Sequence, residues 1–152
     1  GGRRVHGLVL GNAFASLKLQ LRGTPCRVFA DSMKLQIGQD IFYPDVFVTC
    51  DPGDLRTEQI FSAPKLIVEV LSPSTEGYDR GLKFSLYRAL PSLAEYLLVH
   101  PDTREASLFR RGADGLFTLH DFSNAARIEL ASVGCVLGRD KLFEDVDTEP
   151  QA

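Results

Sequence analysis

FYPDVFVTC at residues 42–50, KLIVEVLSPST at 65–75 and YDRGLKFSLYRALPSLAEY at 78–96 are the segments that decide the fold of this chain. The first two have the branched and aromatic residues of β-strands, and the third has the apolar spacing of a helix that stops before Pro91. These segments, followed by a strand at 96–99, predict a sheet with helices packed on it.

Each strand segment carries one acid where its alternation predicts an apolar or inward-facing residue. Asp45 and Glu69 both share a strand face with large apolar side chains. A carboxylate in such surroundings is costly unless it is paired, hydrogen-bonded or bound to a cation. Two such acids on strands that can lie side by side favour a metal site. The structural alternatives are a turn role for Asp45 and a buried ion pair of Glu69 with Lys65 or Arg88.

The bulk composition predicts one globular domain over residues 1–152, with a sizeable core. Apolar residues make up 44% of the chain and charged residues 24%, and the net charge of −3 argues against a generally basic nucleic-acid-binding surface but says little about a local cleft. An acidic stretch that begins at residue 144 is expected to be flexible. Residues 1–30 contain no acid, so their basic side chains are the candidates for contact with a phosphate backbone: Arg3, Arg4, Lys18 and Arg22.

The order of the remaining elements completes the fold prediction. Helical periodicity predicts an amphipathic helix over 4–21, and short strands are expected at 26–30 and 33–37. The helix of the third segment is expected to span 78–90. An antiparallel meander is predicted downstream, with strands at 106–110, 116–119 and 127–130. This order predicts an α/β or α+β domain with a central mixed sheet flanked by helices.

The cysteine spacing and the hydropathy of the chain indicate where in the cell the protein is expected. Cys26, Cys50 and Cys135 are widely spaced, form no Cys-x-x-Cys motif and are expected to be reduced core thiols. No segment approaches the roughly 18 apolar residues of a membrane span, so no membrane partner is expected. No signal peptide is visible, which makes the cytoplasm the expected location.

Several short motifs occur in a fixed order between His6 and His100. They are Tyr-Pro-Asp-Val at 43–46, Glu-Val-Leu-Ser-Pro-Ser-Thr at 69–75, Asp79 with Lys83 and Tyr87, and Glu-Tyr at 95–96. Together they resemble the Uma-two family of restriction endonucleases in the PD-(D/E)XK nuclease superfamily. The resemblance implies a restriction-endonuclease-like core and an endonuclease that uses a metal ion to hydrolyse DNA phosphodiester bonds.

The family pattern assigns the metal ligands to Asp45, Glu69 and the main-chain carbonyl of Val70. Mg²⁺ is the expected ion, with Mn²⁺ as an alternative, because hard cations of this kind prefer oxygen ligands. The superfamily motif places a lysine two residues after the second acid, where this chain has Leu71. The resemblance assigns the role of that lysine to Lys83, which would orient the attacking water and stabilise charge on the phosphate.

Other residues near these motifs are expected to support the site, and each has a structural alternative. Asp79 and Lys83 are also spaced as an exposed helical ion pair. Tyr87 supports Lys83 or packs in the core, and the hydroxyls of Ser72 and Ser74 touch a phosphate or cap the following helix. His6 aligns with a histidine common in the family, with exposure or capping as its alternative roles.

The chain departs from the family pattern at its start. The acidic Glu-x-x-x-Gly-Glu stretch that precedes the first helix in the family is missing, so any contribution of that part of the family domain to the metal site is either lost or lies outside this sequence. This departure, the acidic net charge and the lack of a Glu-x-Lys motif favour an alternative to an active endonuclease. In it, a catalytically decayed nuclease fold acts as a nucleic-acid-binding or scaffold module. A single site cuts one strand, so cleavage of both strands of DNA, the expected partner, implies a homodimer.

Overall fold

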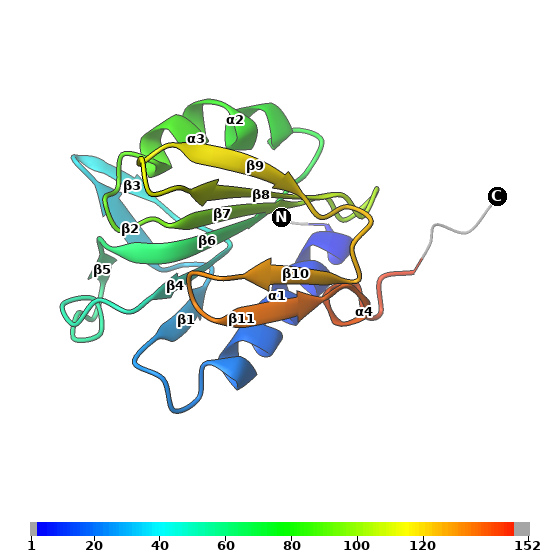
Figure 1. The fold of residues 1–152 in the computed structure, drawn as a ribbon, viewed down its shortest axis with the longest axis horizontal. Coiled ribbons are helices and arrows are strands. Elements are labelled where there is room, and N and C mark those ends of the chain that lie inside the picture. The colour runs from blue at the N-terminus through cyan, green and yellow to red at the C-terminus, as the bar shows by residue number, and fades with distance from the viewer. Residues whose placement is uncertain (1–2, 148–152) are drawn as a thin grey trace.

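The computed structural model describes residues 3–147, which are organised around a six-stranded mixed sheet (Figure 1). Parallel pairing joins β6 to β7, and the other neighbouring strands in this sheet are antiparallel. This arrangement confirms the expected central mixed sheet. The strand order is β1 (Arg27–Ala30), β4 (Val46–Thr49), β6 (Pro64–Val70), β7 (Glu95–Val99), β8 (Ala106–Arg111) and β9 (Phe117–Asp121).

Two small sheets and four helices complete the described part of the chain, residues 3–147. In one small sheet β2 (Lys34–Ile37) lies between β3 (Asp40–Phe42) and β5 (Ile60–Phe61), and in the other β10 (Arg127–Leu130) pairs with β11 (Cys135–Gly138). Over residues 3–147, no helix has the length and hydropathy to cross a membrane. The helices are α1 (Arg4–Gln20), α2 (Glu76–Arg80), α3 (Leu82–Tyr87) and α4 (Arg139–Leu142).

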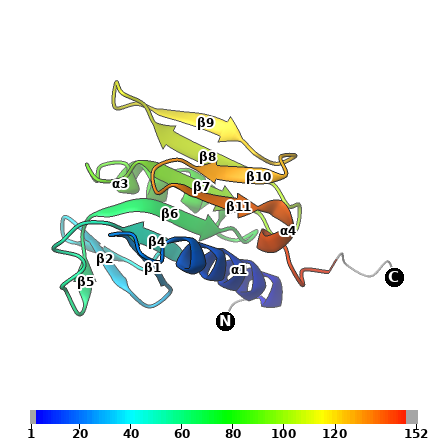
Figure 2. The same cartoon turned by 60° about the horizontal axis from the view of Figure 1, so that its bottom comes forward.

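Side chains of the central strands alternate between two cores, one on each face of the sheet. On β6, Val68 enters a core shared with α1 and with the β10–β11 hairpin, which lie on the same side of the sheet in Figure 2. Its neighbour Ile67 enters the opposite core, which is rich in aromatic rings from α3 and the small β2–β3–β5 sheet. Helices and hairpins therefore cover both faces of β6.

Residues 42–50 do not form the single strand expected from their alternation. The segment divides into the end of β3, in the small sheet, and β4, in the central sheet, with residues 43–45 between them. Pro44 lies in this connection, where its missing N–H and fixed φ favour a break over continued pairing. Asp45 directly precedes β4 instead of alternating within a strand.

The helix expected over 78–90 is also divided. It begins earlier, as α2, and breaks at Gly81, whose φ of −104° and ψ of −98° are not helical. The second part, α3, ends at Tyr87, before the turn that leads to Pro91. The break separates Asp79, on α2, from Lys83, on α3.

The meander expected downstream is correct only in part. Strands β8 and β9 extend the central sheet, but β10 leaves it and pairs with β11, an element that the sequence did not predict. Within the acidic stretch, Val146 is buried, and its carbonyl accepts a hydrogen bond from Arg104 at 2.7 Å. Residues 148–152 of that stretch lie outside the described part of the chain.

The prediction of three reduced thiols is wrong for two of them. Cys26 and Cys50 form a disulfide, whereas Cys135 is a free buried thiol. The antiparallel register pairs Arg27 of β1 with Thr49 of β4, so the next residues outward face each other, with Cα atoms 4.1 Å apart. A separation of 24 residues in sequence conceals this proximity.

Candidate active site

The antiparallel pairing of β4 with β6 brings the two acids of the sequence motifs together. Val46 lies opposite Val68, so the same register places Asp45 beside Glu69. The Asp45 amide donates a hydrogen bond to Glu69 Oε1 at 2.7 Å, and the Val70 amide donates one to Asp45 Oδ2 at 2.7 Å. Because the N–H and C=O of one strand residue point to the same side, the Val70 carbonyl also lies on the Asp45 side of β6.

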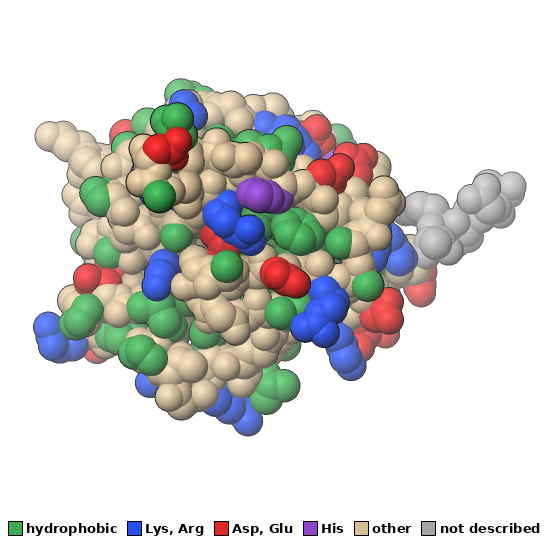
Figure 3. Space-filling view, viewed as in Figure 1, with side chains coloured by type: hydrophobic (Ala, Val, Ile, Leu, Met, Phe, Trp, Pro, Cys, Tyr) green, Lys and Arg blue, Asp and Glu red, His purple; other side chains and the backbone are tan. Residues whose placement is uncertain are grey.

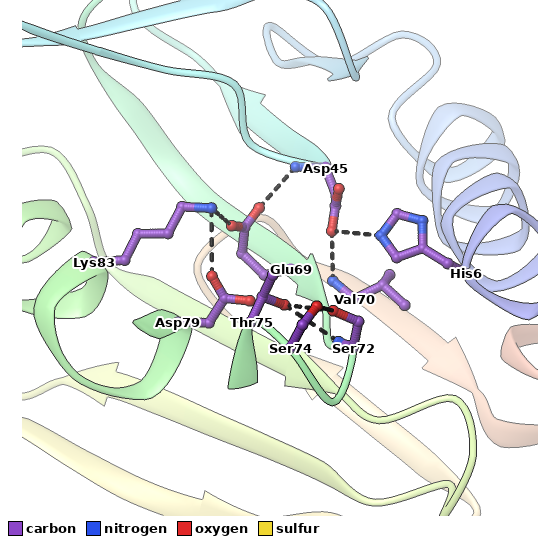
Figure 4. A network of polar contacts seen from close by, with 9 residues as sticks. All are labelled: His6, Asp45, Glu69, Val70, Ser72, Ser74, Thr75, Asp79 and Lys83. Atoms are coloured by element: carbon purple, nitrogen blue, oxygen red, sulfur yellow. Dashed lines mark hydrogen bonds and ion pairs between the residues drawn. The ribbon is translucent and has the colours of Figure 1, made fainter. Parts of the chain in front are cut away.

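Lys83 reaches this pair of acids from α3 (Figure 4). Its Nζ donates a hydrogen bond to Glu69 Oε2 and lies 3.4 Å from Asp79 Oδ1. The side chains of Glu69, Asp79 and Lys83 are 2%, 6% and 15% exposed. The Asp79–Lys83 contact is therefore not the exposed helical ion pair of the alternative interpretation, and Glu69 pairs with Lys83 instead of with Lys65 or Arg88.

Burial and charge act against each other in this cluster. Burial raises the pKa of Glu69 to about 7, although the Lys83 ammonium favours its ionised form. Burial also raises the pKa of Asp79. For Lys83, burial alone would lower the pKa, but the Glu69 and Asp79 carboxylates outweigh burial and raise it above its ordinary value. The ammonium is thus a stable positive charge at the centre of the site.

His6 approaches Asp45 from α1, on the other side of the sheet from Lys83 (Figure 4). Its Nε2 lies 3.2 Å from Asp45 Oδ2, the oxygen that also accepts from the Val70 amide. This hydrogen bond raises the pKa of His6, and burial opposes it. Sequence reasoning left the role of His6 open, because nothing local to α1 indicates a carboxylate 39 residues away.

The cluster lies in a cavity of about 550 Å³ at the carboxyl end of β6. Ser72 and Ser74 line it, but neither caps α2. The Ser72 hydroxyl instead bonds Ser74 Oγ at 3.2 Å and Thr75 Oγ1 at 2.9 Å. Arg3, predicted from the sequence only as a contact for a phosphate backbone, also lines the cavity. Three further lining residues were not singled out from the sequence: Pro73, Thr75 and Tyr78.

Two buried tyrosines, Tyr87 and Tyr96, lie near the cluster, and removing the hydroxyl is expected to affect stability differently at each. The Tyr96 hydroxyl donates a hydrogen bond to the Asp79 carbonyl at 3.0 Å. Tyr87 is fully buried, and Lys83 Nζ lies 5.6 Å from the centre of its ring. The Tyr87 hydroxyl has no hydrogen-bond partner within residues 3–147. We expect Tyr96→Phe to lower the free energy of unfolding by about 1 kcal/mol, and Tyr87→Phe to leave it unchanged or raise it. Urea unfolding of both variants measures the difference. Equal losses would contradict this assignment of partners.

The donor atoms of the cavity fit a hard divalent cation. Two carboxylates and one main-chain carbonyl supply oxygen ligands, as Mg²⁺ requires, and the ion usually keeps several waters. Each Glu69 oxygen accepts one hydrogen bond and retains a second lone pair, and Asp45 Oδ1 has no hydrogen-bond partner within residues 3–147. Residues 3–147 contain no group of three His, Cys, Asp or Glu side chains that could hold a metal, so a site here needs the Val70 carbonyl and water.

Comparison with known proteins identifies the family. The model of the Uma2 family, described as "Putative restriction endonuclease", matches residues 1–135. The chain belongs to the Uma2 family. An uncharacterized Synechocystis protein, slr1290, is 38% identical to this Uma2 protein over 145 residues, which cover 94% of this chain and 76% of the relative. A second uncharacterized Synechocystis protein, sll1609, is 34% identical over 103 residues, covering 65% and 58% of the two chains.

A solved structure supports the fold of this Uma2 protein. It is described as "a putative nuclease belonging to DUF820" from Anabaena variabilis, and it matches with a TM-score of 0.76 at 16% sequence identity. The likeness covers 96% of this chain and 84% of the other. The α+β architecture expected from the sequence is therefore shared with a nuclease-like fold, and the family membership expected from the motifs is confirmed.

Proposed function

We propose that this Uma2 protein is an endonuclease that uses Mg²⁺, or Mn²⁺, to hydrolyse phosphodiester bonds of DNA in the cavity at the end of β6. Asp45, Glu69 and the Val70 carbonyl would hold the ion. When bound, the ion supplies positive charge that offsets the phosphate charge and makes a water molecule a better nucleophile. Asp79, Tyr87, Ser72 and Ser74 are assigned supporting roles.

The observation that carries this proposal is the position of the Lys83 ammonium. The superfamily motif would place a lysine at residue 71, but Leu71 is 0% exposed and packs in the aromatic-rich core. Lys83 reaches the same pair of acids from α3 and lines the cavity with them. A cation beside two acids in a solvent-accessible cavity is the arrangement that phosphoryl hydrolysis requires, because negative charge grows on the phosphate as water attacks.

Lys83 and Asp79 then have separate roles in the hydrolysis. Lys83 donates a hydrogen bond to the attacking water or to a phosphate oxygen, in place of part of its present contact with Glu69. The water oxygen bonds to phosphorus as the water loses a proton to solvent. The bond from phosphorus to the leaving oxygen breaks, and that oxygen gains a proton. Asp79 holds the Lys83 ammonium in position from α2, 3.4 Å away.

Plasmid nicking tests the proposal directly. Supercoiled DNA incubated with the protein is expected to convert to the open-circular form in Mg²⁺ or Mn²⁺ and to remain supercoiled when EDTA is added. Cleavage in EDTA at the same rate would contradict metal dependence. Intact DNA in both metals, together with saturable DNA binding, would favour the alternative of a decayed site that acts as a binding module.

Two other expectations stay predictions. A homodimer would allow both strands of DNA to be cut, because one site cuts one strand. The cytoplasmic location is in tension with the Cys26–Cys50 disulfide, since structural disulfides are typical of oxidising compartments.

A further inference from the structure

A second hollow, of about 240 Å³, lies at the C-terminal end of α1 and the start of β1. Three basic side chains line it, those of Lys18, Arg22 and Arg27, and its lining contains no acid. All three are exposed, and none forms an ion pair within residues 3–147. In a protein with a net charge of −3, three neighbouring cations without acidic partners form a local site for an anion.

The lining of this hollow is partly fixed in place. Arg27 Nη1 donates hydrogen bonds to the carbonyls of Thr24 at 2.7 Å and Cys26 at 2.8 Å. These bonds hold the guanidinium, which has five N–H donors, and leave its remaining donors for a ligand. The lower edge of the face in Figure 3, where Figure 1 shows the end of α1 and the start of β1, carries basic side chains without acidic ones beside them.

Helix α1 connects this hollow to the candidate active site. Its first turns carry His6, which contacts Asp45, and its last turn carries Lys18. Figures 1 and 2 show the helix running along one side of the sheet between these two ends. Lys18 lies 12 residues beyond His6, which is a rise of about 18 Å at about 1.5 Å per residue. That rise equals about five base-pair steps of about 3.4 Å.

The exposed side of α1 between the two sites carries small, uncharged residues. Gly7, Gly11 and Ala15 are exposed there, and a Cβ atom added at either glycine would meet nothing within 4 Å. Glycine in a helix interior costs about 1 kcal/mol relative to alanine, and no internal contact of this protein requires it here. Between residues 7 and 15 this stripe therefore presents no acid and no large side chain to a polyanion, and Leu19, 62% exposed, is the first exposed large apolar side chain beyond it.

We infer that the hollow lined by Lys18, Arg22 and Arg27 binds backbone phosphate of DNA about five base pairs from the bond that is cut. The inference rests on the proposed function, because it takes DNA as the substrate of the Asp45–Glu69–Lys83 site. It adds a second, sequence-independent contact that fixes the direction in which the duplex crosses the protein. Contacts of this kind supply affinity and register but do not read bases.

The test compares two triple variants with the same change of charge. One is Lys18→Ala/Arg22→Ala/Arg27→Ala, and the control removes exposed basic residues that line neither cavity, Lys34→Ala/Arg56→Ala/Lys141→Ala. Binding of a 20-base-pair duplex is measured by fluorescence anisotropy in EDTA, over a range of NaCl concentrations. The slope of log K against log [NaCl] is negative, and each lost phosphate contact reduces its magnitude by about 0.9, so the magnitude is expected to fall by about 2 to 3 in the first variant. The control is expected to keep the wild-type slope.

Equal slopes in the two triple variants would overturn the inference, because bulk charge alone would then explain the loss. The single variants Lys18→Gln, Arg22→Gln and Arg27→Gln, each expected to lose about one unit of slope, keep the test valid if the triple variant does not fold. The Asp45→Asn variant distinguishes failure of DNA binding at the hollow from failure of the proposed cleavage. If that variant and the wild type bind DNA with the same slope but the wild type never cuts, the proposed chemistry fails and the binding site stands.

Discussion

Replacing Lys83 with alanine is expected to lower kcat for metal-dependent DNA cleavage by about 10²–10³-fold, the usual effect of removing one group that stabilises developing charge. The Lys83 ammonium is the cation that the structure places beside Glu69 and Asp79. Without it, Glu69 loses its ion-pair partner, and the attacked phosphate loses the positive charge that this ammonium supplies. Nicking rates of supercoiled plasmid at saturating Mg²⁺ measure the loss.

The control for this variant is Lys65→Ala, which removes a lysine from the same strand as Glu69 but outside the cavity. It should cut at the wild-type rate. Lys83→Ala also leaves the buried Glu69 without its ion-pair partner, and breaking a buried pair can cost about 3–5 kcal/mol of stability. Lys83→Met keeps the apolar stem of the side chain and provides a second variant if alanine prevents folding. Full activity in either folded variant would remove Lys83 from the mechanism.

Replacing Asp45 with asparagine is expected to abolish cleavage and saturable metal binding while preserving the fold. The asparagine carbonyl can still accept the hydrogen bond that the Val70 amide donates, so the local backbone keeps its partner. The lost negative charge, however, removes a proposed ligand of the ion. The loss in Mn²⁺ affinity should exceed the 10- to 100-fold typical of removing a group that only supports a ligand. Isothermal titration calorimetry with Mn²⁺ measures it.

Asp40→Asn is a suitable comparison, because Asp40 is an exposed carboxylate on β3 that does not line the cavity. It should bind Mn²⁺ and nick plasmid as the wild type does. Metal binding by Asp45→Asn at the wild-type affinity would show that the ion, if one binds, is held elsewhere. Loss of binding in both variants would indicate a diffuse electrostatic effect instead of a site.

Local sequence patterns determined most of the elements of this protein. Helix α1 and the central strands β6 and β7 lie close to where their periodicity places them, because buried apolar residues must follow the period of their own element. The order of motifs also determined the family, since several short motifs at fitting distances are specific in combination. The same motifs single out Asp45, Glu69 and Lys83.

Tertiary structure alone decided how those residues meet. The register that sets Asp45 beside Glu69 depends on the pairing of distant strands, and the contact of Lys83 with Glu69 depends on the packing of α3 against that sheet. The His6–Asp45 contact and the Cys26–Cys50 disulfide have the same origin. Periodicity reports how a segment is buried, whereas a site forms from segments that the sheet brings together, and the partner of a segment is not encoded in its own pattern.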